Sequence, residues 1–125
     1  MIQPKAQTGN ATSFPRYGQI VEVSLDPVIG AETGKRRPAL VISNDINNQY
    51  AATVTVLPIT SVPSRKIYPF QADLPKGIGG LTEDSRVKCE QIRTIDKSRI
   101  VAFWGQVPDV ELKTVMAALK VHLSL

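Results

Sequence analysis

A run of three cations is the feature of the sequence best suited to chemistry. The cations are Lys35, Arg36 and Arg37. They follow a glycine, and Pro38 directly after them begins an apolar segment. This order predicts a loop that carries cationic side chains to the mouth of a buried strand. Arg holds phosphate well because its guanidinium offers paired donors and keeps its charge at any working pH. The segment therefore favours a phosphodiester site.

Other small polar and charged side chains also stand at the ends of predicted strands. They are Asn44, Thr60, Ser61, Arg65, Glu90, Gln91, Arg93 and Arg99. With the cation run, these residues could line a groove for nucleic acid, or they could form a solvated rim around a sheet. A net charge of +4, from 15 cations against 11 anions, favours an anionic partner only mildly. Composition alone leaves both interpretations open.

The familiar catalytic and metal-binding sets are not found. Cys89 and His122 are the only residues of their types, so they cannot supply a zinc site or an internal disulfide. Cys89 is predicted to be a core residue, and His122 to lie near the end of a helix. The glycines at 77–80 predict a turn, because no strand and helix flank them as in a phosphate-binding loop. Glu83 and Asp84 are predicted to be solvated. We expect no metal and no cofactor.

The elements that must position these residues follow a β pattern. In residues 19–25, Val21, Val23 and Leu25 alternate with polar residues, as a half-buried strand requires. Further strands are predicted at 37–43, 52–57, 68–74, 85–89 and 100–104. In the strand at 37–43, residues 39–42 are continuously apolar, which is typical of a strand covered on both faces. In 85–89 we expect Arg86 and Lys88 to point outward.

Two features modify this pattern. Pro58 cannot donate to a ladder, which predicts that the third strand ends at Leu57 and that residues 59–61 lie at an edge or a bulge. Residues 44–50 predict a turn or one short helical turn, and 90–96 have mixed character. The connection at 26–36 is long against the usual hairpin length of about two to five residues. We expect it and the second loop, at 62–67, to contribute to function.

The end of the chain changes period. Residues 109–125 place apolar side chains three and four apart, which predicts an amphipathic helix. Its apolar stripe consists of Leu112, Val115, Met116, Leu119 and Leu123. About six short strands and this helix predict a mainly β domain, a strongly bent antiparallel sheet or partly closed barrel with the helix covering an open face.

The 125 residues fit one domain. Residues 1–15 are polar and aperiodic, which predicts a flexible N-terminal arm before a domain at 16–125. No apolar run approaches the roughly 20 residues that span a bilayer, and the chain does not open like an export signal. We therefore expect no membrane association and a cytoplasmic location.

Five blocks, taken in order, carry a resemblance to a known family. They are GQIVEV at 18–23, LDPVIGAE at 25–32, RPALVISND at 37–45, PITS at 58–61 and EQIRTIDK at 90–97. In these blocks the chain resembles the MazF/PemK family from about Arg16 to its end. Gln19 departs from the pattern, since an acid is common there, and the leading arm has no counterpart in the shortest members.

The resemblance implies a small SH3-like or CcdB-type barrel that forms a homodimer. It also implies an endoribonuclease that cuts single-stranded RNA such as mRNA, as the toxin partner of a cognate antitoxin protein. By position, Arg37 and Thr60 are similar to the family's catalytic arginine and threonine. Asn44, Glu90 and Gln91 are similar to positions that contact RNA. Lys35, Arg36, Ser61 and Arg65 complete the predicted RNA-binding set.

Three alternatives stay open at this point. A CcdB-like relative can poison gyrase by protein contact alone, a basic barrel can hold RNA without cutting it, and an inactive member can be retained as an antitoxin partner. A joint role of Arg37 and Thr60 at one phosphate would separate an endoribonuclease from the first two.

Overall fold

The computed structural model describes residues 14–25, 29–32, 35–62 and 66–125. The predicted arm at 1–15 lies almost wholly outside this part of the chain. The strands are β1 (Gln19–Ser24), β2 (Arg36–Val41), β3 (Thr53–Ser61), β4 (Gln71–Leu74), β5 (Ser85–Lys88), β6 (Arg93–Asp96) and β7 (Ile100–Gln106). The helices are α1 (Asp45–Tyr50) and α2 (Asp109–Leu123), with short 3-10 turns η2 (Ile78–Gly80), η3 (Cys89–Gln91) and η4 (Lys97–Arg99).

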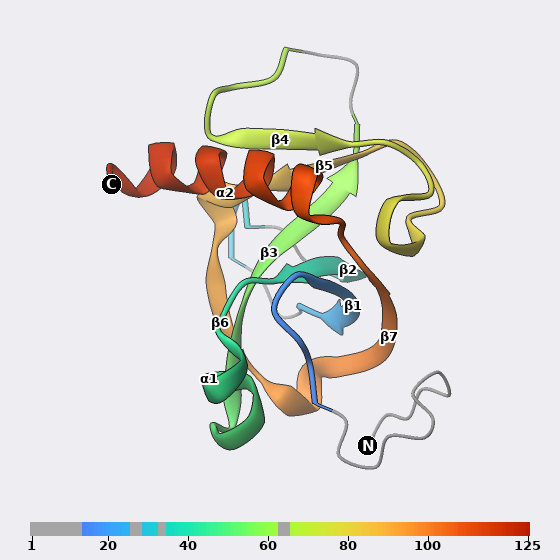
Figure 1. The fold of residues 1–125 in the computed structure, drawn as a ribbon, viewed down its shortest axis with the longest axis vertical. Helices are drawn as coiled ribbons and strands as arrows, with labels where there is room; N and C mark the ends of the chain where they lie inside the picture. The colour runs from blue at the N-terminus through green and yellow to red at the C-terminus, as the bar shows by residue number, and fades with distance from the viewer. Residues whose placement is uncertain (1–13, 26–28, 33–34, 63–65) are drawn as a thin grey trace.

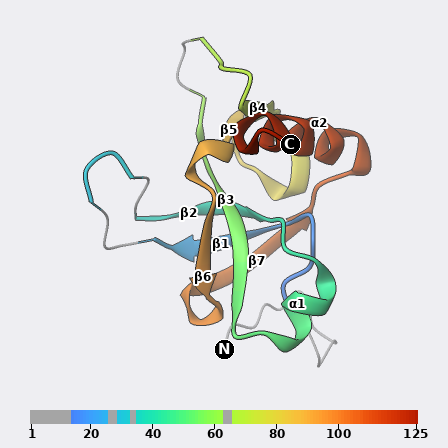
Figure 2. The same ribbon diagram turned by 90° about the vertical axis from the view of Figure 1, so that its left-hand side faces the viewer.

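The strands form one bent antiparallel sheet of seven strands that does not close on itself. Their order is β4-β5-β3-β2-β1-β7, and β6 pairs with β3 off this path (Figure 1). Figure 2 shows β3 running the length of the molecule, from α1 at one end to β4 and α2 at the other. The prediction of a mainly β fold with a C-terminal helix is confirmed.

The central strands bury side chains on both faces. Val21 and Val23 of β1 belong to one apolar cluster, while their neighbour Ile20 belongs to the other. In β2, Ala39 joins the first cluster and Leu40 the second. This alternation follows from the two-residue period of a strand, and it explains why the last three residues of β2, at 39–41, are all apolar. The bent sheet thus separates two cores.

Helix α2 closes one of these cores. Leu112, Val115, Ala118 and Leu119 are its buried residues, and the helix packs on β4 and η3. The predicted stripe is confirmed in its middle, whereas Leu123 in the last turn is 42% exposed. Ser124 ends the helix with a left-handed φ of 60°. None of the helices in the described ranges is long and apolar enough to cross a membrane.

The prediction that the third strand ends at Leu57 is wrong. Strand β3 continues through a buried Pro58 to Ser61. Pro58 is the last β3 residue to pair with β2, opposite Ala39, and the next residue, Ile59, pairs with β5. On the other edge of β3, pairing with β6 ends at Val56 and pairing with β5 begins at Ile59, so Pro58 lies between two ladders and its missing N–H interrupts neither. Proline here marks a change of partner within one strand.

Three further predictions need correction. Arg86 was expected to point into solvent, but it is only 5% exposed. It forms an ion pair with Asp73 on the neighbouring strand. The fourth strand begins at Gln71, since its predicted first residues form a turn in which the Gln71 N–H donates to the Tyr68 carbonyl. The mixed segment at 90–96 contains a seventh strand, β6, which pairs with the first half of β3. Its Ile95 is buried, but its short length hides the two-residue period.

Candidate active site

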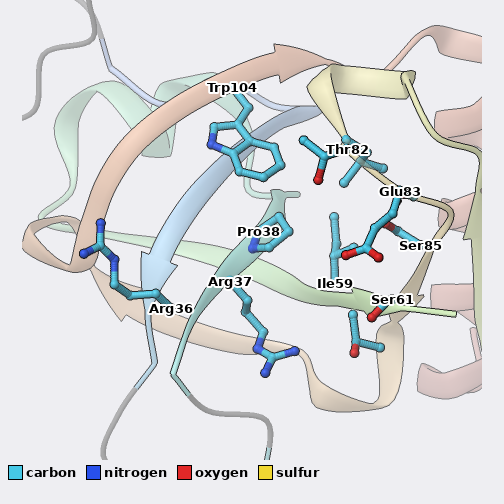
Figure 3. Close-up of a pocket in the computed structure, with 11 residues that line it drawn as sticks. Arg36, Arg37, Pro38, Ile59, Ser61, Thr82, Glu83, Ser85 and Trp104 are labelled. Carbon is cyan, nitrogen blue, oxygen red and sulfur yellow. The ribbon is translucent and has the colours of Figure 1, made fainter. Parts of the chain in front are cut away.

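A pocket of about 290 Å³ opens where β2 and β3 separate. Arg37 from β2 and Thr60 from β3 both line it, although they lie far apart in the sequence. The other lining residues are Arg36, Pro38, Ile59, Ser61, Leu81, Thr82, Glu83, Ser85 and Trp104 (Figure 3). The volume is near the lower end of the roughly 300–1,000 Å³ typical of small-ligand sites, so it suits a piece of a polymer such as one nucleotide.

The strand register explains why Arg37 and Thr60 meet. The last pair between β2 and β3 is Ala39 with Pro58. Extending that antiparallel register by two residues in each strand places Arg37 opposite Thr60. Beyond Ala39 and Pro58 the two strands no longer pair with each other. Thr60 keeps its pairing with Arg86 of β5 on the outer edge of β3, and Arg37 keeps its pairing with Val23 of β1 on the outer edge of β2. The cation and the hydroxyl therefore lie on the two sides of the opening.

The two arginines of the pocket are placed differently. Arg36 is held by Glu22 at 3.4 Å, and its side chain is 63% exposed, so this ion pair adds little to stability. In Figure 3 the Arg36 side chain lies apart from the middle of the pocket, whereas Arg37 stands between Arg36 and Ser61. Arg37 is half-buried at the start of its strand. Of the two, Arg37 has the better position to hold a phosphate beside Thr60.

Sequence reasoning missed one wall of this pocket. Trp104 comes from β7, and Thr82 and Glu83 come from the segment between η2 and β5. Glu83 and Asp84 are exposed, as predicted, yet Glu83 also lines the pocket. The strand predicted at 100–104 includes Trp104 only as one apolar residue among others. Its identity as the only tryptophan of the chain was the available signal.

Known proteins resemble this chain both in sequence and in fold. The model of the PemK-like, MazF-like toxin of type II toxin-antitoxin systems matches residues 16–123. The chain belongs to this family. Endoribonuclease MazF9 of Mycobacterium tuberculosis is 42% identical over 115 residues, covering 88% of this chain and 97% of that protein.

Two crystal structures from Deinococcus radiodurans are also similar. MazF (Form-I) has a TM-score of 0.77 and 31% identity, and the match covers 90% of this chain and 99% of that one. MazE-MazF (Form-II) has a TM-score of 0.69 and 31% identity, covering 89% and 96%. This chain therefore matches nearly the whole length of each of these relatives.

The remaining predicted RNA-binding residues that the structure describes do not line the pocket. Lys35 precedes β2 with a left-handed φ of 66°. Asn44 follows the far end of β2 and caps α1, where its Oδ1 accepts the Asn47 N–H at 2.8 Å. Arg65 lies outside the described residues. The pocket thus brings together Arg36, Arg37, Thr60 and Ser61 of the predicted set.

Glu90 and Gln91 lie in η3, the short turn that connects β5 to β6. Glu90 is half-buried, and its Oε2 accepts a bond of 2.9 Å from the Gln71 amide, while Oε1 is buried without a hydrogen bond in the described structure. Gln91 reaches the Ala31 carbonyl at 3.5 Å. Both of these hydrogen bonds are made to other residues of the protein. The prediction that Glu90 and Gln91 bind RNA therefore still rests on the family resemblance.

Cys89 is fully buried in the larger core, which confirms its predicted structural role. Burial, with the charge of Glu90 adding to it, raises the pKa of the Cys89 thiol to about 12. A thiol in this state is not a nucleophile at neutral pH. His122 is exposed on α2, with its ring 6.4 Å from that of Phe70. Within the described residues, no group of three or more His, Cys, Asp or Glu side chains could hold a metal ion.

Proposed function

We propose that this toxin-family member is an endoribonuclease that cuts single-stranded RNA. The observation that carries the proposal is the placement of Arg37 and Thr60 in one pocket. A relative that is 42% identical and is named an endoribonuclease supports the same activity. Neither a gyrase-binding protein nor a barrel that only holds RNA needs this pair at one phosphate.

The proposed reaction uses the substrate's own 2′-OH. Its oxygen attacks the adjacent phosphorus, and the bond from phosphorus to the 5′-oxygen breaks. The products are a 2′,3′-cyclic phosphate and a 5′-OH end, after one proton has left the 2′-oxygen and one has reached the 5′-oxygen. DNA lacks the attacking group and is not cut. The reaction requires no metal ion.

Arg37 and Thr60 have separate roles in this proposal. Arg37 stabilises the charge that develops on the phosphoryl oxygens, a role worth about 10³ to 10⁵ in rate, or roughly 4 to 7 kcal/mol. Thr60 donates a hydrogen bond to the same phosphate and orients it. Arginine is a poor base, since its pKa exceeds about 12. Its contribution is therefore electrostatic rather than the removal of the 2′-OH proton.

The partners follow from family membership. We propose that the protein acts as a homodimer, is neutralised by a cognate antitoxin protein, and works in the cytoplasm, where its RNA targets are found. The solved MazE-MazF structure, at 31% identity, supports an antitoxin partner. We expect a soluble antitoxin to form a stable complex with the purified toxin and to stop its cleavage of RNA.

The activity is tested by incubating a long RNA with purified protein in excess EDTA. We expect cleavage, with 2′,3′-cyclic phosphate and 5′-OH ends, and no cleavage at a site whose 2′-OH has been replaced by hydrogen. Products with a 3′-OH, or loss of cleavage in EDTA, would contradict the mechanism. An intact RNA together with inhibited gyrase would instead favour the protein-binding alternative.

The role of Arg37 is tested by Arg37→Ala, with Lys35→Ala as its matched control. Both variants remove one cation from the same segment, but Lys35 does not line the pocket. We expect Arg37→Ala to lose at least about 10³-fold in kcat/KM while remaining folded. Lys35→Ala should lose less than about 10-fold. Equal losses in the two variants would mean that the segment acts only through its total charge.

A further inference from the structure

Resting on the proposed endoribonuclease function, we infer that Trp104 and Glu83 form a base-binding subsite beside the cleaved phosphate. Trp104 stacks on a base flanking that phosphate, and the Glu83 carboxylate accepts a hydrogen bond from the exocyclic amino group of the base. The subsite therefore selects adenine, cytosine or guanine over uracil at that position.

Trp104 is placed to stack. It is half-buried and packs against the larger core, yet it also lines the pocket shared by Arg37 and Thr60. In Figure 3 its indole lies above the ring of Pro38, at the edge of the open middle of the pocket. An aromatic face in a cationic groove holds a base without a hydrogen bond, and stacking typically contributes about 1–3 kcal/mol per base, which is about a 5- to 150-fold change in binding.

A close glycine contact fixes this wall. Gly105 follows Trp104 in β7, and a Cβ added to it would lie 3.0 Å from the backbone carbon of Gly79 in η2. A side chain at Gly105 would therefore crowd this approach between the strand and the turn. Gly80 also lies near the root of Trp104, since a Cβ at Gly80 would be 3.6 Å from the Trp104 Cβ. The indole is therefore presented by a rigid element, as a specificity residue requires.

Glu83 faces Trp104 across the pocket. Its side chain points toward the middle of the pocket in Figure 3. Two hydrogen bonds hold the backbone at Glu83 and at the residue after it. Ser85 Oγ donates to the Glu83 carbonyl at 2.8 Å, and the Val62 N–H donates to the Asp84 carbonyl at 3.2 Å. Asp84 further accepts the Lys76 N–H at 2.9 Å. The carboxylate thus projects from a fixed segment.

The chemistry of a carboxylate determines which base it accepts. An ionised carboxylate can only accept hydrogen bonds. Adenine, cytosine and guanine each carry an amino group that donates, whereas the one edge donor of uracil lies between two carbonyl oxygens that repel the carboxylate. A base without the amino group loses this hydrogen bond, so it should be a poorer substrate.

Trp104 can be tested directly by fluorescence, because it is the only tryptophan of the chain. Wild-type protein is titrated with a short RNA whose 2′-oxygens are methylated, so that it binds but cannot be cut. Stacking predicts saturable quenching of the Trp104 emission at the same concentration that inhibits cleavage of an unmodified RNA. Inhibition without any change in emission would overturn the role of Trp104, and it requires no variant that could fail to fold.

Variants then test stacking in the reaction. Trp104→Ala should lower kcat/KM by about 10- to 100-fold, and Trp104→Phe should recover most of that loss because it keeps an aromatic face. Equal losses in the two variants would contradict stacking.

Glu83 is tested by removing the amino group from the substrate. The preferred flanking base is first found with RNAs that carry each of the four bases on either side of the break. It is then replaced by its counterpart without the amino group, namely purine for adenine, pyrimidin-2-one for cytosine or hypoxanthine for guanine. In wild type this should cost about 5-fold or more in kcat/KM. In Glu83→Ala the same change should cost less than 2-fold.

Two outcomes of this experiment would overturn the role of Glu83. One is a preference for uracil on both sides of the break. The other is a uniform loss in Glu83→Ala for all bases, with the acid limb of the pH–rate profile removed, which would make Glu83 a proton acceptor instead. Asp109→Ala is the matched control, since it removes an exposed acid outside the pocket. If wild type cuts no RNA at all, the proposed function fails rather than the subsite.

Discussion

At the scale of single residues, a row of polar side chains crosses the sheet from the pocket to β4. Thr60 of β3 pairs with Arg86 of β5, and Arg86 pairs with Asp73 of β4. Residues directly opposite in antiparallel strands share one face. Two atoms of the Arg86 guanidinium donate to Asp73, at 2.7 and 3.1 Å. These bonds raise the pKa of Arg86 and fix the strand next to Thr60.

This ion pair gives a prediction for stability. Asp73→Ala leaves the nearly buried Arg86 charge without its carboxylate, so we expect a loss of about 3 kcal/mol in the free energy of unfolding. Adding Arg86→Met to that variant should recover most of the loss. Glu22→Ala, which breaks the exposed pair with Arg36, should cost less than about 1 kcal/mol. Urea unfolding measures all four proteins, and equal costs for the two single acid variants would contradict this account.

A second residue-scale prediction concerns Cys89. Burial raises its pKa from 9.0 to about 12, so the thiol stays protonated in the folded protein at pH 8. We expect no reaction with a thiol reagent at that pH in buffer, and one full equivalent in urea. Rapid labelling of the native protein would contradict the buried position.

The same shift affects stability in alkali. A thiol whose pKa is higher in the folded state than in the unfolded state stabilises the fold fully below pH 9.0, and this contribution is lost as the pH rises toward 12. Three pKa units correspond to about 4 kcal/mol. The alkaline loss of stability should therefore be smaller in Cys89→Ala than in wild type, when each is compared with its own value at pH 8.

At the scale of elements, β3 organises the site. Its first half pairs with β6 and β2, and its last residues pair with β5, so one strand belongs to both parts of the bent sheet. Pairing with β2 ends at Pro58, and the pocket opens between the ends of the two strands. Proline thus lies where the ladder with β2 ends and where, on the other edge of β3, β5 follows β6.

The contact between η2 and β7 can be tested by a single methyl group. In Gly105→Ala the new Cβ would lie 3.0 Å from the Gly79 carbon and 3.1 Å from its carbonyl oxygen, so backbone must move. We expect a loss of about 1–3 kcal/mol in stability, with a shifted emission of the neighbouring Trp104. Gly30→Ala is the control, because a Cβ there would meet no other described residue within 4 Å apart from its chain neighbours.

The control at Gly30 still has a left-handed φ of +59°. Gly30→Ala should therefore cost about 1 kcal/mol from backbone conformation alone and leave the Trp104 emission unchanged. A Gly105→Ala protein with wild-type stability and emission would show that the glycine contact does not position Trp104.

At the scale of the whole molecule, local periods predicted most of the elements, and the order of five blocks predicted the family. Alternation placed Val21 and Val23 on one face, and the helical period placed Leu112 and Val115. Such patterns depend on near neighbours in the chain. They could not predict the partner that buries Arg86, since Asp73 comes from another strand.

The same limit applies to the site. Arg37 and Thr60 were predicted from family blocks, and the register of β2 and β3 explains why they share a pocket. Trp104 and Glu83 reach that pocket because a turn with two left-handed glycines folds η2 against β7. No period or motif in the sequence encodes that contact. Long-range closure of this kind has to be read from the structure.

The central claim is that Arg37 and Thr60 act on one phosphodiester. A double-mutant cycle tests it most directly, with kcat/KM measured on one RNA for wild type, Arg37→Ala, Thr60→Val and the double variant. Thr60→Val keeps the shape of the side chain and removes the hydroxyl. Because both residues stabilise the same transition state, we expect strong coupling, with the double variant little slower than Arg37→Ala alone. Fully additive losses would mean that the two side chains act at separate places, and would contradict the account.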